Sequence, residues 1–226
     1  MRLRSTISGE AAVNVLSVSV SKPQVVEIDG KMVSTGIFKR PVDGPIMLRE
    51  FDFDGDGQGD LSVHGGPHRA AYVYPSEHYD YWQAELGRDD FSFGLFGENL
   101  TLEGLTEDTA HIGDEFKIGG ATVVVTQPRV PCFKLAHVIG LPEFPKQFLA
   151  SGRTGFYLRV VEEGAVTAGD AVELVKPDPE AMSVREVCNL LYFDQKNLDD
   201  ARRAIGIAAL SPGWRGSFEV RLAKAG

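Results

Sequence analysis

The chain has 226 residues, of which 43% are hydrophobic and 24% are charged, as in an ordinary globular protein. Its formal net charge of -9 argues against a general nucleic-acid-binding protein, which would normally be basic. No apolar run is long enough to cross a membrane, and the basic N-terminal segment lacks the apolar core of a signal peptide. We therefore expect a cytoplasmic protein that binds neither nucleic acid nor a membrane.

Most of residues 1–178 have the pattern of β-structure. Apolar residues alternate with small polar residues over positions 13–20, with one slip at Leu16, as in a half-buried strand. Asp29 and Gly30 separate two apolar runs and predict a tight hairpin. Further strands are expected in the segments GPIMLREF, DEFKIGG, ATVVVTQP, GFYLRVVEEG and DAVELV. Short strands separated by Gly, Asp and Pro are typical of a barrel or a sandwich.

We expect one helix within this region and three helices after it. The first is PSEHYDYWQAEL, whose aromatic residues fit a buried face better than a binding site. After residue 178, Ser183 with Glu186 forms a capping box, Asn197 is a second N-cap, and Ser211 is a third. These signals predict a mainly β domain over residues 1–178, followed by a small three-helix domain over residues 179–226.

An acidic segment, DFDGDGQGDLSV, resembles a calcium-binding loop in part. Asp52, Asp54 and Asp56 occupy alternating positions, but the twelfth position, which must supply a bidentate Glu, is Val63. Strand-like sequence, rather than helices, flanks the segment. We interpret it as an acidic, glycine-rich surface turn.

The chain contains two cysteines, and only one of them has a setting that suggests chemistry. Cys132 follows a proline just beyond an expected strand, and the positive charges of Arg129 and Lys134 would favour its thiolate form. The alternative is a small buried hydrophobic residue, the commonest role of a free cysteine. Cys188 falls on an expected amphipathic helix, and a reducing compartment argues against a disulfide between them.

Three further sets of residues are considered as candidates for ligand binding. His64 and His68 are four residues apart, but the glycines and proline between them exclude a helical zinc pair. Gly65 and Gly66 would allow a ligand to approach the backbone closely, although a tight turn needs the same residues. The amide of Asn99 could donate to phosphate or ring oxygens, or could instead close an Asx-turn.

Several of these segments occur in the order found in one family. They are GIFKRPVDGP, GDGQGDLSVHGGPHRA, YPSEHYDYW, FGENLTLEGLTED, IGDEFKIG and QPRVPCFKL. Together they resemble the MOSC domain family, named for the C-terminal domain of molybdenum cofactor sulfurases. The resemblance covers roughly residues 10–215 and is greatest to the stand-alone bacterial branch that includes the 6-hydroxylaminopurine reductase.

The resemblance implies a β-barrel that binds the molybdenum cofactor (molybdopterin), followed by a small three-helix domain. The invariant family cysteine matches Cys132, which would be the thiolate ligand of the metal and a catalytic residue. Extrapolation from motif position adds Lys39, Arg129 and Lys134 near the phosphate and pterin, and Gly65, Gly66 and Asn99 as close contacts. His64 is either a proton donor or a structural residue. His68 departs from the family pattern, in which we expect Asp at this position.

The implied activity is a detoxifying reduction of N-hydroxylated compounds such as hydroxylamino purines. Two cysteines cannot hold an iron–sulfur cluster, so an external electron-transfer reductase would supply the electrons. The alternatives are a cofactor or sulfur carrier without turnover, and a metal-free thiol enzyme that would lack a nearby resolving cysteine. Pyridoxal phosphate binding is also attached to the family, but no lysine here has a context that argues for it. A homodimer is left open.

Overall fold

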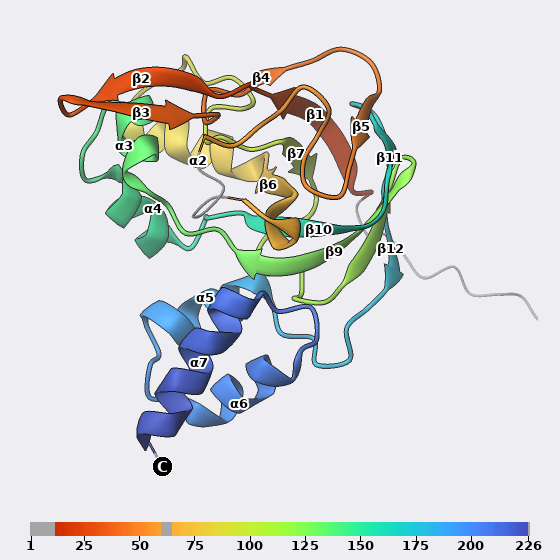
Figure 1. Ribbon diagram of the computed structural model, residues 1–226, viewed down its shortest axis with the longest axis vertical. Coiled ribbons are helices and arrows are strands. Elements are labelled where there is room, and N and C mark those ends of the chain that lie inside the picture. Colours follow the sequence, from red (N-terminus) through yellow and green to blue (C-terminus); the bar gives the residue numbers. More distant parts are fainter. Residues whose placement is uncertain (1–11, 60–64, 226) are drawn as a thin grey trace, which may run out of the picture.

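The computed structural model describes residues 12–59 and 65–225, and its centre is an eight-stranded sheet (Figure 1). The strands follow the order β12-β8-β9-β10-β6-β7-β1-β4, and only the β6–β7 pair is parallel. They are β1 (Asn14–Val20), β4 (Arg40–Pro41), β6 (Ala71–Pro75), β7 (Leu100–Glu103), β8 (Glu115–Ile118), β9 (Ala121–Pro128), β10 (Phe156–Glu162) and β12 (Val172–Lys176). The mainly β architecture expected from the sequence is confirmed.

The sheet curls until its ends nearly meet, which agrees broadly with the expected β-barrel, although the barrel is not fully closed. The Val15 N–H donates to the Asp170 carbonyl at 2.9 Å, and the Gly169 N–H donates to the Val15 carbonyl at 2.8 Å. Only Val172, the first residue of β12, adds a further bond, to the Val13 carbonyl at 2.9 Å. The remainder of β12 pairs with β8, so a full ladder that would close the barrel is missing.

Two short antiparallel pairs lie beside this sheet. One joins β5 (Ile46–Leu48) to β11 (Gly164–Val166), and the other is the hairpin of β2 (Gln24–Ile28) and β3 (Lys31–Thr35). Asp29 and Gly30 connect the hairpin with φ of 51° and 75°, the left-handed values of a type I′ turn. The slip at Leu16 also has a structural counterpart, because the β1–β7 register shifts between Val15 and Ser17.

Among the described residues of the β-rich region there are three α-helices and one 3₁₀ turn, where we expected a single helix. The elements are η1 (Pro67–Arg69), α2 (Glu77–Leu86), α3 (Phe133–Ile139) and α4 (Phe144–Ser151). Helices α3 and α4 are short and stand next to Pro, Gly and charged residues, so their sequence carries little helical periodicity. Tyr79 and Trp82 of α2 are buried with Phe144 and Phe148 of α4, which confirms that the α2 aromatics are core residues.

The chain ends in three helices, α5 (Val184–Tyr192), α6 (Leu198–Gly206) and α7 (Pro212–Ala225). The capping box expected at Ser183 is formed, since its hydroxyl accepts from the Glu186 N–H while the Glu186 carboxylate accepts from the Ser183 N–H. Asn197 caps α6 without a reciprocal box, since its Oδ1 accepts from the Asp200 N–H at 3.1 Å. No helix within the described residues has both the length and the apolar character needed to span a bilayer.

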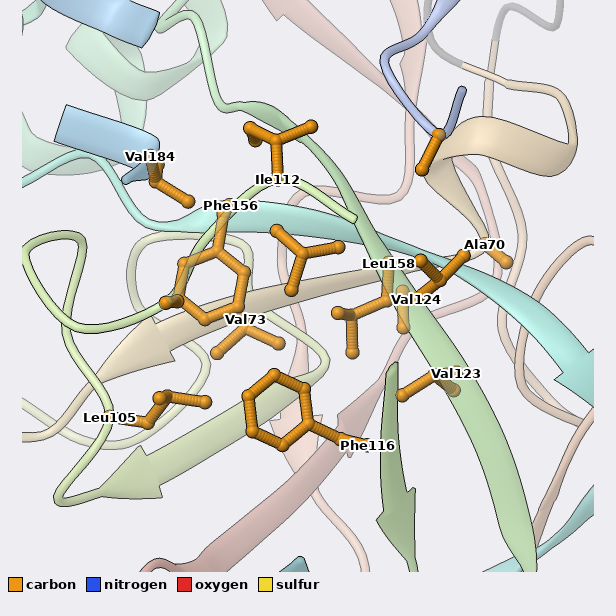
Figure 2. Close-up of a cluster of buried hydrophobic side chains, with 14 of the residues drawn as sticks. Ala70, Val73, Leu105, Ile112, Phe116, Val123, Val124, Phe156, Leu158 and Val184 are labelled. Carbon is orange, nitrogen blue, oxygen red and sulfur yellow. The ribbon is translucent and has the colours of Figure 1, made fainter. Parts of the chain in front are cut away.

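One hydrophobic core runs from the sheet into these helices. Figure 2 shows Phe116, Phe156 and Leu158 from the strands in one cluster with Val184 of α5. Trp214 of α7 belongs to the same cluster and is also buried. Because the sheet and the helices share this core, the domain boundary after residue 178 stays a prediction.

Candidate functional site

Cys132 lies in a rigid turn between β9 and α3. It is the N-cap residue of α3, and its carbonyl accepts from the Leu135 N–H at 3.0 Å. A hydrogen bond holds the other end of the turn, where the Arg129 N–H donates to the Gly155 carbonyl at 3.1 Å. Cys132 is half-buried and free, so its thiol is accessible while its backbone is held.

The thiol lies in a cavity of about 100 Å³ that brings together distant parts of the chain. The lining side chains include four cations and, in the described part of the chain, one carboxylate. The lining residues are Thr35, Gly36, Ile37, Lys39, Asp56, Gly57, Gln58, Gly59, Arg69, Tyr72, Gly97, Asn99, Arg129, Val130, Cys132, Lys134 and Tyr157. An excess of positive charge in an enclosed space favours an anionic ligand.

Arg129 is the buried cation of this cavity. Its guanidinium carbon lies 5.1 Å from the ring centre of Tyr72 and 5.2 Å from that of Phe148. The Nη2 atom donates over a long 3.4 Å to the Phe96 carbonyl, and the buried Nη1 atom has no hydrogen-bond partner among the described residues. A buried charge with an unused donor is costly, so the guanidinium is arranged for a ligand that supplies the missing acceptor.

Lys39, Asp56 and Asn99 form a second wall, in which hydrogen bonds join the three side chains. Lys39 Nζ lies 2.6 Å from both oxygens of the Asp56 carboxylate, whose side chain is 2% exposed. The Asn99 Nδ2 atom donates to Asp56 at 2.7 Å and to the Ser19 carbonyl at 3.2 Å, and its Oδ1 accepts from the Tyr72 N–H at 3.1 Å. Both N–H groups of the Asn99 amide are therefore used within the protein.

A buried carboxylate orders the turn that leads to Asn99. Glu98 accepts from the backbone N–H groups of Gly94 at 2.6 Å and Phe96 at 3.1 Å, and also from the Tyr79 hydroxyl. Burial raises the pKa of Glu98, while these hydrogen bonds act in the opposite direction. The same turn supplies the Phe96 carbonyl that meets Arg129, so Glu98 supports the site from outside the cavity.

Two tyrosines complete the wall. The rings of Tyr72 and Tyr157 lie 5.3 Å apart at an interplanar angle of 39°, and both residues line the cavity. The Tyr72 hydroxyl donates to the Thr154 carbonyl at 2.7 Å. Burial raises the pKa of Tyr72 well above its usual value, so its phenol stays neutral and adds no negative charge beside Arg129.

Two family models match this chain. The MOSC domain model matches residues 60–173, and the YiiM-like, 3-alpha helix domain model matches residues 182–225. The Bacillus subtilis (strain 168) protein YflK is 47% identical over 91% of this chain and 92% of its own length. The chain belongs to the MOSC family.

Other relatives agree with this assignment. Protein YiiM of Escherichia coli (strain K12) is 36% identical over 83% of this chain and 84% of its own length. The crystal structure of YiiM from Geobacillus stearothermophilus has a TM-score of 0.80 and 36% identity, and the match covers 93% of this chain and 99% of that chain. A Gibberella moniliformis protein named "Reductase" is 34% identical over 67% of this chain but only 28% of its own length.

Five residues that we assigned to the MOSC site from the sequence line the cavity. They are Lys39, Asn99, Arg129, Cys132 and Lys134. Gly65 and Gly66 do not line it; instead they precede η1, where the Gly66 carbonyl accepts from the Arg69 N–H at 3.0 Å. His64 falls outside the described residues.

Asp56 is the residue that we misjudged. We assigned the segment around it to a surface turn, yet its carboxylate is buried against Lys39. Asp54, two residues away, does lie at the surface, where it pairs with Arg49 at 2.7 Å. No group of three or more His, Cys, Asp or Glu side chains that could hold a metal ion occurs in residues 12–59 and 65–225. The sequence shows the alternating acidic residues, but it does not show which carboxylate points inward. That depends on Lys39 and Asn99, which lie far from Asp56 in the chain.

The other cysteine behaves as a core residue. Cys188 is buried on α5 and free. Burial raises the pKa of its thiol to about 12. At neutral pH it is therefore an unreactive thiol and serves as an internal control for chemistry at Cys132.

Gly36→Ala is expected to disturb the cavity wall. A Cβ atom at this position would lie 2.2 Å from the Gly57 carbonyl oxygen and 3.2 Å from that of Ser21, and both are backbone atoms. Overpacking of this kind costs about 1–3 kcal/mol. Thermal unfolding should show a Tm lower by roughly 2–4 °C for each kcal/mol lost.

The matched control is Gly216→Ala in helix α7, where a new Cβ meets nothing within 4 Å. Alanine is a better helix former than glycine, so this change should leave the Tm unchanged or raise it. Equal Tm values for the two variants would contradict the close approach of the segments around Gly36 and Gly57.

Proposed function

We propose that this MOSC protein binds the molybdenum cofactor and reduces N-hydroxylated compounds such as hydroxylamino purines. The observation that carries the proposal is the cavity in which the accessible thiol of Cys132 lies together with the buried cations Arg129 and Lys134. A thiolate is a soft metal ligand, and guanidinium and ammonium groups bind phosphate. Membership of the MOSC family supports the same cofactor.

The residues present fit this group by their chemistry. Cys132 would be the metal ligand, and Arg129 would offer its unpartnered Nη1 donor to a phosphate or pterin oxygen. Lys134, which is 7% exposed, would add a second charge. Lys39 keeps one of its three N–H donors after bonding Asp56.

The remaining assigned residues have narrower roles. Asn99 can offer a ligand only its carbonyl oxygen, because both of its N–H groups are used. Tyr72 and Tyr157 would form an aromatic wall that limits the access of water. Gly65 and Gly66 as backbone contacts, and His64 as proton donor, stay predictions.

The proposed reaction breaks an N–O bond. Conversion of an N-hydroxyl group to an amine takes up two electrons and two protons and releases one molecule of water. When bound, the cofactor supplies two-electron oxygen-atom chemistry, while the protein binds and orients the reactants. An external electron-transfer reductase would supply the electrons. The fungal relative named "Reductase" supports this class of activity, although this chain matches only 28% of it.

The test is to express the chain in a host that makes the cofactor and to measure molybdenum per chain by elemental mass spectrometry. The protein is then given a chemical reductant and a hydroxylamino purine, and the amino purine product is quantified. Near-stoichiometric metal with product formation would support the proposal. Metal without product would favour a carrier instead, and no metal would overturn cofactor binding.

A further inference from the structure

Asp56 is the one carboxylate among the described residues that line the cavity, and it is almost completely enclosed. Its two oxygens accept hydrogen bonds from three directions. Lys39 Nζ lies 2.6 Å from each oxygen, Asn99 Nδ2 lies 2.7 Å from Oδ2, and the Ser21 N–H lies 2.9 Å from Oδ1. A carboxylate with this many charge-assisted bonds fixes the groups that surround it.

The hydrogen bonds to Asp56 fix the orientation of the Lys39 ammonium group. Two of its three N–H donors are taken by Asp56, so the third has a fixed direction rather than rotating freely on a flexible stem. The ion pair also cancels most of the Lys39 charge. The cationic excess of the cavity therefore comes mainly from its other basic residues, of which Arg129 and Lys134 are buried.

The loop that carries Asp56 is itself held in place by close backbone contacts. A Cβ atom on Gly59 would lie 2.1 Å from the Ser34 carbonyl oxygen, and one on Gly36 would lie 2.2 Å from the Gly57 carbonyl oxygen. These distances show that the loop lies directly against the end of β3 and the residue that follows it. Asp56 therefore has little freedom to turn outward as Asp54 does.

We propose that Asp56 is a positioning residue of the cofactor site, which aims the third Lys39 donor at the ligand and locks the Asn99 amide into the wall. The proposal rests on the proposed function, and its two central residues, Lys39 and Asp56, precede the segment matched by the MOSC model, residues 60–173, in which Asn99 lies. Asp56 acts through Lys39 and Asn99 and does not touch the reacting atoms.

The first experiment needs no cofactor. Cofactor-free protein is treated with limiting acetic anhydride, and acetylation of Lys39 relative to Lys22 is followed by peptide mass spectrometry. In Asp56→Asn the Lys39 ammonium loses its charged partner, and we expect its acetylation to be faster by about tenfold or more. The control Asp54→Asn removes a carboxylate on the same loop that pairs at the surface, so it should leave the rate unchanged.

The second experiment measures molybdenum retained per chain after dialysis of wild type, Asp56→Asn, Lys39→Met and the double variant. If Asp56 acts mainly through Lys39, each single variant should lose about tenfold in retention. The double variant should lose clearly less than the two single losses combined, because only the contacts with Asn99 and Ser21 remain for Asp56→Asn to disturb. If the losses in molybdenum retention are fully additive in the double variant, the positioning role would be overturned. The same holds if retention falls only in proportion to a lower Tm. Lys39→Met keeps the Asp56 bonds to Asn99 and Ser21, so it reports on the pair even if Asp56→Asn folds poorly.

The outcomes separate the two proposals. Wild type without molybdenum would count against the proposed function, whereas the acetylation result would still decide whether Asp56 fixes Lys39. Equal Lys39 acetylation in wild type and Asp56→Asn would overturn the inference about Asp56 even in a protein that binds the cofactor fully.

Discussion

Cys132→Ala is expected to reduce bound molybdenum to background and to abolish N-hydroxy reduction. Cys132 is the only thiol that lines the cavity in the described part of the chain, so no neighbouring sulfur can replace it. The change removes one half-buried sulfur atom and should cost less than about 1 kcal/mol of stability. The measurements are molybdenum per chain, product formed with a chemical reductant, and Tm.

The matched control is Cys188→Ala. This change removes a buried thiol from α5, outside the cavity, and should lower the Tm slightly while leaving molybdenum content at the wild-type level. A Cys132→Ala protein that keeps its metal would contradict the assignment of the ligand. A protein that loses metal in both variants would indicate general destabilisation instead.

Two local signals in the sequence predicted local structure correctly, whereas the hydroxyl of Ser211, the third expected N-cap, has no hydrogen-bond partner among the described residues. The Asp29-Gly30 turn requires two left-handed residues, and the pair adopts these angles. The capping box at Ser183 joins residues three positions apart, so all of the information needed for it lies in one short segment. The presence of cations in the cavity of Cys132 was predictable for the same reason, because Arg129 and Lys134 are its near neighbours in the chain.

What the sequence could not supply is the set of distant partners. Asp56 becomes a site residue only because Lys39 and Asn99, 17 and 43 positions away, converge on it. An acidic segment rich in glycine is usually exposed, and local pattern does not distinguish Asp56 from Asp54. The failure to predict α3 and α4 has a related cause, because Phe144 and Phe148 of α4 pack on Trp82 of α2. Tertiary packing of this kind stabilises short helices whose own sequence signal is weak.

Arg129→Met is expected to change stability and binding in opposite directions. The substitution removes a buried charge that has an unpartnered donor and replaces it with an apolar side chain of similar length. Replacing buried charges by apolar residues often raises stability by about 1–4 kcal/mol. Molybdenum retention should nevertheless fall by about a hundredfold, because charge-assisted bonds to the ligand are lost. Thermal unfolding of the cofactor-free proteins and metal content after dialysis measure the two effects separately.

Two further variants show whether the charge itself is responsible. Arg129→Lys keeps the charge but loses the planar fork, so it should retain an intermediate amount of metal. Arg153→Met removes a cation that lies 3.9 Å from the ring centre of Tyr81 outside the cavity, and it should leave metal content unchanged. If Arg129→Met lowered the Tm, the contacts with Tyr72 and Phe148 would already compensate the guanidinium. If instead it raises the Tm and releases the metal, the protein keeps a destabilising charge in its interior because the ligand, rather than the fold, requires it.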